Sequence, residues 1–142
     1  MRHVVAAIVL LGLAGVAGGG CASPSQDAGD DTGDAILARA FEDRARDLQV
    51  EGGGTVVRVL ADDTEGGRHQ RFVMRLDSGQ TLLVAHNIDL APRVEDLQEG
   101  DAVAFRGVYE WNAEGGAIHW THRDPDGEHA SGWLRHGGRT YD

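Results

Sequence analysis

Lysine is absent from this sequence of 142 residues, and cysteine occurs only once, at position 21. A single cysteine excludes an internal disulfide, and the histidine-rich stretch near the C-terminus contains no cysteine that could help to bind a metal. The formal net charge of −10 argues against a general nucleic-acid binder, because neutralising phosphates requires a basic surface. No nucleophile elbow, P-loop or dinucleotide-binding glycine pattern is present, so none of those enzyme classes is indicated.

The first 21 residues have the features of a secretory signal, since two basic residues precede an apolar run over residues 4–17. This run is shorter than the roughly 20 apolar residues of a spanning helix. The order resembles a bacterial lipoprotein signal, in which Cys21 would be lipidated; ordinary cleavage near Ala22, with release of the protein, is the alternative. Ala22 resembles the sorting residue of outer-membrane lipoproteins. We therefore expect a periplasmic protein, anchored by its lipid to the outer membrane of a Gram-negative bacterium.

The next two segments predict a linker and a helix. Residues 22–33 are polar and rich in glycine, without periodicity, and predict a disordered linker. Apolar residues between Leu37 and Leu48 then recur at spacings of 4, 4 and 3, which predicts an amphipathic helix over residues 34–52. Asp34 would cap the start of this helix, and a triplet of glycines would end it.

From residue 53 onward, the pattern is that of short strands separated by turns. Strands are predicted over residues 55–60, 70–76, 81–88, 102–112 and 117–122, followed by a mostly irregular tail. Three strands, a short connection and two more strands are the order of an OB-fold, a five-stranded Greek-key barrel. The sequence therefore predicts an all-β, OB-like barrel over residues 53–142 with one N-terminal α-helix; an open β-meander is the alternative.

The predicted last hairpin brings a carboxylate to a histidine. If residues 113–116 form a four-residue loop, Glu110 lies opposite His119. A neighbouring carboxylate raises the pKa of an imidazole and fixes its tautomer, as a catalytic base requires. Glu110 and His86 are therefore the candidate catalytic residues; a surface ion pair is the alternative for Glu110 with His119.

A second group of histidines surrounds the end of this hairpin. His119, His122, Asp124 and His129 fall within eleven residues, and an Asp-Pro-Asp-Gly turn between them would bring the chain back on itself. Histidine and carboxylate ligands suit Zn²⁺ or another divalent ion. We therefore predict a metal site at these four residues. Alternatively, the histidines hydrogen-bond the loop in place.

Other polar residues cluster at the ends of the predicted strands and would form a ligand-binding rim. His86 shares a face with Leu82 and Val84, which places it near this rim. Asp89 and Arg93 could instead pair with each other and hold the connection that follows. The candidate ligand-binding residues are His69, Gln70, His86, Asn87, Asp89, Arg93, Asn112 and Trp120.

Seven segments of the sequence together resemble DUF3465, a family of small exported bacterial proteins. The segments are GGTVVRVLADD, GRHQRF, SGQTLLVAHNIDLAPR, GDAVAF, GVYEWNAEGG, IHWTHRDPDGEH and GWLRHGGRTY. They run from Gly53 to Tyr141. The resemblance implies a stand-alone periplasmic or lipid-anchored domain, and it implies no activity because the family has no established one.

Three functions are compatible with these patterns. The favoured one is a binding module that holds a small ligand, an oligosaccharide or an envelope protein on the rim of the barrel. The second is a metal-dependent hydrolase, such as a nuclease, in which the four predicted ligands hold the ion and Glu110 or His86 activates water. The third is a structural lipoprotein without a ligand.

Overall fold

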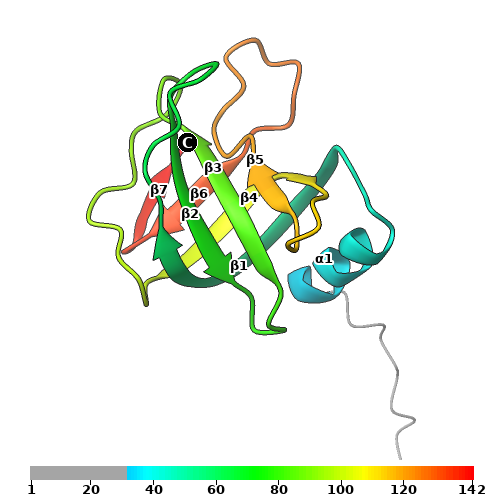
Figure 1. Cartoon of the computed structure of the whole chain (residues 1–142). Helices are drawn as coiled ribbons and strands as arrows, with labels where there is room; N and C mark the ends of the chain where they lie inside the picture. Colours follow the sequence, from blue (N-terminus) through cyan, green and yellow to red (C-terminus); the bar gives the residue numbers. More distant parts are fainter. Residues whose placement is uncertain (1–31) are drawn as a thin grey trace, which may run out of the picture.

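Residues 32–142 are described in this computed structural model (Figure 1). The predicted secretory signal, Cys21 and residues 22–31 of the predicted linker lie outside that range. The described chain forms one helix followed by seven strands. No helix within residues 32–142 is long and apolar enough to cross a membrane.

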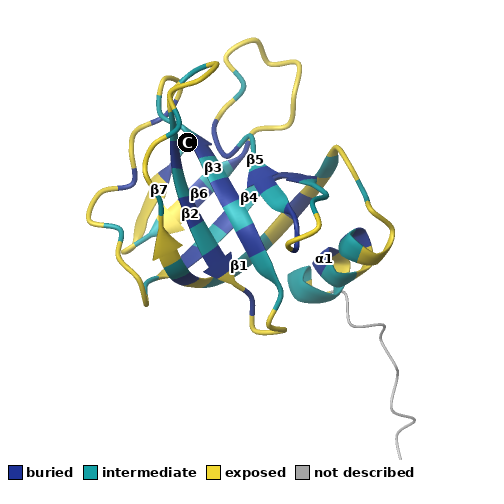
Figure 2. Cartoon of the chain, in the orientation of Figure 1, coloured by how far each residue is buried: buried dark blue, intermediate teal, exposed yellow. Residues whose placement is uncertain are grey.

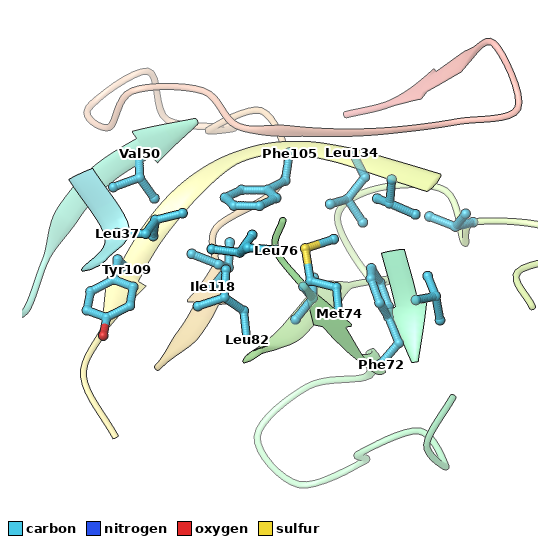
Figure 3. Close-up of a cluster of buried hydrophobic side chains, with 14 of the residues drawn as sticks. Leu37, Val50, Phe72, Met74, Leu76, Leu82, Phe105, Tyr109, Ile118 and Leu134 are labelled. Carbon is cyan, nitrogen blue, oxygen red and sulfur yellow. The ribbon is translucent and has the colours of Figure 1, made fainter. Parts of the chain in front are cut away.

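The helix α1 spans Gly33–Glu42 and is shorter than predicted. Its N-cap is Thr32, whose hydroxyl accepts a hydrogen bond from the Ala35 amide at 3.4 Å. Asp34, the predicted cap, lies in the first turn and accepts a hydrogen bond from the Ser78 amide at 2.9 Å. The helix buries Leu37 against the barrel, which fixes its position (Figure 3).

The glycine triplet that was expected to end the helix lies instead within strand β1, Leu48–Val59. A Cβ atom on Gly52 would lie 2.9 Å from the ring of Phe105, and one on Gly54 would lie 2.4 Å from the carbonyl oxygen of Arg75. These glycines are needed because other parts of the barrel pack closely against the strand. The prediction of helix over residues 34–52 was therefore wrong beyond Glu42.

The remaining strands are β2 (His69–Arg75), β3 (Thr81–Asn87), β4 (Ala102–Glu110), β5 (Ala117–His119), β6 (Trp133–His136) and β7 (Arg139–Tyr141). Strands β1, β2 and β3 form an antiparallel meander, and β3 then pairs with β5 in parallel. Strand β4 pairs with both β5 and β1, which closes the sheet. This closed order of five strands confirms the predicted OB-like barrel with one helix.

The tail that was predicted to be irregular forms a hairpin of β6 and β7. Strand β6 pairs with β4 at Val103–Arg106, beyond the point where β5 ends. Leu134 and Tyr141 of this hairpin are buried in the core. The turn between the two strands is a pair of glycines with positive φ, a conformation that suits tight hairpins.

The core fills the barrel with alternate residues of each strand (Figures 2 and 3). On β2 and β3 every second residue is buried, and the residues between them face outward. The inward residues of these two strands are Gln70, Phe72, Met74, Leu82, Val84 and His86. Two of those six, Gln70 and His86, are polar and lie opposite each other at one end of the two strands, where they need hydrogen-bond partners.

Candidate functional site

His86 lies near the C-terminal end of β3 and is fully buried, whereas the prediction placed it at an open rim. Its Nε2 atom lies 2.9 Å from the carbonyl oxygen of Pro92, and its Nδ1 atom lies 2.7 Å from the hydroxyl oxygen of Thr121. Because a carbonyl only accepts, Nε2 carries the proton and Nδ1 accepts from the Thr121 hydroxyl. Burial lowers the pKa of His86, which favours this neutral form. His86 thus joins two segments, and both of its ring nitrogens are engaged.

Gln70 is also buried and serves the same connection between β3 and β4. Its Nε2 atom donates to the carbonyl oxygen of Val94, and its Oε1 atom accepts from the Val94 amide, both at 2.9 Å. The side chain therefore bonds both backbone groups of Val94, as a neighbouring strand would. Both atoms of the Gln70 amide are engaged in holding the loop.

His69 and Asn87 are opposite each other on β2 and β3, so the predicted neighbours meet. The Nδ1 atom of His69 lies 3.3 Å from the carbonyl oxygen of Gly67, and the Oδ1 atom of Asn87 accepts from the Asp89 amide at 2.9 Å. Both side chains are half-buried. They stabilise the turns at the ends of their strands.

The predicted ion pair between Asp89 and Arg93 is wrong, because each residue has another partner. Asp89 accepts from the backbone amide and from the Nε atom of Arg68, both at 2.8 Å. These bonds from Arg68 lower the pKa of the Asp89 carboxyl group. Arg93 pairs with Asp62 instead. The loop between β1 and β2 therefore folds over the connection that follows β3.

The predicted register of the β4–β5 hairpin is wrong by two residues. The Oδ1 atom of Asn112 accepts from the amides of Glu114 and Gly116, both at 2.9 Å, and the loop covers residues 111–116. Glu110 therefore pairs with Ala117 rather than with His119. A shift of two residues preserves the faces of a strand, so Glu110 and His119 still lie diagonally. Their Oε1 and Nε2 atoms are 3.7 Å apart, and Glu110 also accepts from a backbone amide.

Strand β5 ends at His119, three residues earlier than predicted, because the chain turns sharply at Trp120. Trp120 has a φ of 56°, a left-handed conformation that is rare for a bulky residue and costs about 1–3 kcal/mol. Its indole ring lies against the imidazoles of His122 and His129, with centroid distances of 5.0 Å and 4.5 Å. The buried His122 donates from Nδ1 to the carbonyl oxygen of Arg123 at 2.7 Å.

The four predicted metal ligands are engaged separately. His119 lies beside Glu110, whereas His122 and His129 contact Trp120. Asp124 accepts hydrogen bonds from the amides of three later residues in its own loop, and these bonds lower the pKa of its carboxyl group. In the part of the chain that the structure describes, no group of three or more His, Cys, Asp or Glu residues could hold a metal ion.

The outward faces of β1, β2 and β3 carry a cluster that the sequence reasoning missed. Val73 on β2 lies between Arg58 on β1 and Leu83 on β3. Arg71 and Arg75 lie two residues before and two residues after Val73, on the same face of β2. We call this surface the arginine face. It consists of Arg58, Arg71 and Arg75 around an apolar strip of Val73, Leu83 and Ala85.

The three guanidinium groups have no acidic partner among the described residues. Within residues 32–142, no carboxylate lies at ion-pairing distance from Arg58, Arg71 or Arg75. Arg71 donates from Nε to the carbonyl oxygen of Ala61 at 3.1 Å, whereas Arg58 and Arg75 are exposed and form no hydrogen bond with described residues. Like charges at neighbouring cross-strand positions repel one another. The cluster is therefore an unneutralised positive surface on an acidic protein.

A hollow of about 250 Å³ lies against this face. Its lining consists of Arg58, Val73, Thr81, Leu82, Leu83, Asn112, Glu114 and Gly116. Of the residues predicted to bind a ligand, Asn112 alone borders it. The signal that could have revealed the face is the alternation Arg71-Phe72-Val73-Met74-Arg75, in which the outward charges all have one sign.

Comparisons with known proteins extend to nearly the whole chain. Residues 22–142 match the family described as Protein of unknown function (DUF3465). No match to this chain was found among the curated proteins. The resemblance drawn from the sequence segments is therefore confirmed, and the OB-like barrel described above belongs to a member of the DUF3465 family.

Proposed function

We propose that this protein is an exported binding module of the cell envelope that holds an anionic ligand on its arginine face. One observation carries the proposal: three arginines with no acidic partner in the described part of the chain surround an apolar strip beside a hollow, in a chain of net charge −10. Clustering like charges costs stability, and a bound anion would offset that cost.

The side chains define the chemistry of the ligand. Guanidinium groups are planar donors that bind carboxylates and phosphates through two parallel hydrogen bonds. The apolar strip beside them suits the carbon skeleton of a ligand. We therefore propose an acidic oligosaccharide, in which the sugar rings carry carboxylate groups.

Single-stranded nucleic acid fits this face less well, because its binding sites combine a basic groove with aromatic rings on which bases stack. None of the residues of the arginine face is aromatic. The tryptophans contact other side chains instead: Trp111 lies against Phe41, and Trp120 lies against two histidines. The predicted export signal and lipid anchor would also place the protein among envelope polymers rather than nucleic acids.

The two alternative functions have less support. A metal-dependent hydrolase would require ligands that converge, whereas His122 and His129 contact Trp120 and Asp124 binds backbone amides. A purely structural lipoprotein would gain nothing from three arginines that have no acidic partner among the described residues. A binding role explains why these charges are kept on the surface.

The proposal can be tested by calorimetric titration of the full-length chain with trigalacturonate, an acidic trisaccharide, at 50 mM and 300 mM salt. We expect binding that the double variant Arg58→Gln/Arg75→Gln weakens at least tenfold. Higher salt should weaken binding to the wild type more than binding to this variant, because salt screens exposed charges.

The matched control is Arg46→Gln/Arg135→Gln, which removes the same charge from two exposed positions elsewhere. This control should bind within twofold of the wild type. Equal weakening in both double variants would mean that only net charge matters, and the proposed site would then be wrong. Absence of binding in the wild type at 50 mM salt would also count against it.

A further inference from the structure

A second hollow, of about 460 Å³, lies between α1 and the end of the barrel. Figure 1 shows the helix beside the loop that joins β4 to β5. The hollow is lined by Ala38, Phe41, Glu42, Ser78, Gly79, Gln80, Thr81, Ala113, Glu114 and Gly115. Its volume falls in the range of small-molecule sites, roughly 300–1,000 Å³.

The lining of this hollow favours a cation. Phe41 provides an aromatic wall, and the carboxylates of Glu42 and Glu114 form no ion pair within residues 32–142. Gln80 donates through Nε2 to the carbonyl oxygens of Leu37 and Gly115, at 3.2 Å and 2.8 Å. These bonds fix the amide and leave Oε1 as a further acceptor. A hollow with acceptors, an aromatic ring and no arginine suits an ammonium or guanidinium group.

The two hollows adjoin each other. Thr81 and Glu114 line both of them, and the Thr81 hydroxyl donates to the carbonyl oxygen of Glu114 at 2.9 Å. This bond fixes the boundary between the two hollows. Arg58 lines only the first hollow and Glu42 only the second, so the two outer ends of this surface carry opposite charges, with Glu114 at the boundary.

We infer that the ligand is zwitterionic, with an anionic group on the arginine face and an organic cation in the hollow beside α1. This inference rests on the proposed function, because the anionic half of the ligand occupies the same arginine face. A ligand that reaches both hollows gains from the second contact without a second loss of translational freedom. The arrangement would therefore favour a ligand with both charges over one that carries the anionic group alone.

The experiment uses ω-amino acids of four to eight carbons as probes, with the alkanoate and the alkylamine of the same length as controls. Amide chemical shifts of the full-length chain give the affinity of each probe. We expect one chain length of the amino acid to bind at least tenfold more tightly than its alkanoate, with shifts at both Val73 and Gly79. That optimal length would measure the span between the two charged groups.

The variant Glu42→Gln separates the two hollows, because Glu42 lines only the second one. This substitution should lower the affinity for the amino acid about fivefold and leave the affinity for the alkanoate unchanged. Glu99→Gln is the matched control, since Glu99 is exposed and lines neither hollow. The control should leave the affinities of both probes unchanged.

The possible outcomes keep this inference and the proposed function apart. If the alkanoate binds through the arginines and the amino acid binds no more tightly at any length, the zwitterion is wrong and the anion site stands. If binding of the alkanoate does not depend on Arg58 and Arg75, the proposed function itself fails. If Glu42→Gln and Glu99→Gln lower the affinity for the amino acid equally, the second hollow does not hold the cation.

Discussion

The two faces of strands β2 and β3 treat their polar residues in opposite ways. Inside the barrel, Gln70 and His86 have partners for every polar atom of their side chains, at 2.7–2.9 Å. Outside it, Arg75 of β2 and Arg58 of the adjoining strand β1 have no partner among the described residues. The same part of the sheet thus carries polar groups that hold the fold and polar groups that remain available. The difference lies in whether a partner is present, not in the residue type.

Energetics explain why the comparison separates structure from function. A buried polar group without a partner costs about 1–3 kcal/mol, so most buried polar groups are satisfied within the fold. An exposed guanidinium group is satisfied by water and can exchange that water for a ligand. We therefore expect substitutions on the inner face to change stability and those on the outer face to change binding.

The largest effect should come from His86→Leu, which leaves the Thr121 hydroxyl and the Pro92 carbonyl oxygen buried without their partner. We expect the free energy of unfolding to fall by about 3 kcal/mol, measured by urea denaturation. His86→Gln retains a donor and an acceptor and should lose less. A drop below 0.5 kcal/mol (about the noise of a surface substitution) for His86→Leu would contradict the structural role.

Gln70→Leu should have the next largest effect. It removes two hydrogen bonds to Val94 and leaves a buried amide and carbonyl group unpaired. We expect a loss of about 2 kcal/mol in the free energy of unfolding. Hydrogen exchange should show faster exchange over residues 88–101, the connection that Gln70 holds. Unchanged exchange there would show that the connection is held by other contacts.

The inner face should also make stability depend on pH. Burial lowers the pKa of His86, so below about pH 6.5 the unfolded chain binds a proton that the folded chain does not. The free energy of unfolding should therefore fall as pH decreases through this range, by at most about 1.4 kcal/mol per pH unit, and this contribution should be constant above it. His86→Gln should remove this part of the slope. An identical pH profile in the variant would sink the assignment.

The smallest effect on stability is expected on the outer face. Arg58→Gln/Arg75→Gln removes two like charges that have no partner within residues 32–142, so the free energy of unfolding should rise slightly or change by less than about 0.5 kcal/mol. Thermal melting of this variant beside Gln70→Leu would measure the contrast directly. A loss of more than about 1 kcal/mol would mean that the arginines are structural after all.

Much of the fold could be predicted because burial imposes a period of two on strands. The alternation around Phe72 and Met74 defines β2, and the order of strands predicts the OB-like barrel. The end of the helix was predicted wrongly because glycine commonly ends a helix, whereas Gly52 lies in a strand and makes room for the ring of Phe105. That contact joins residues distant in sequence, which no local pattern records.

The candidate site was harder to predict, because residue type does not show which polar groups have partners. The sequence predicts His86 and Gln70 as ligand-binding residues, but their polar atoms are satisfied by Pro92, Thr121 and Val94. The arginines of the outer face looked like ordinary solvent-exposed positions. Their clustering depends on the register that places Arg58 beside Val73, and this register includes a β-bulge in β1.

The central claim is that ligands bind the outer face of β2 and β3 and not the histidine-rich loop. It is tested most directly by following every backbone amide of the full-length chain during a titration with trigalacturonate. We predict that the largest chemical-shift changes fall on Arg58, Val73 and Leu83. Changes centred on Trp120 to His129, with none at Val73, would contradict the account and return the site to the loop.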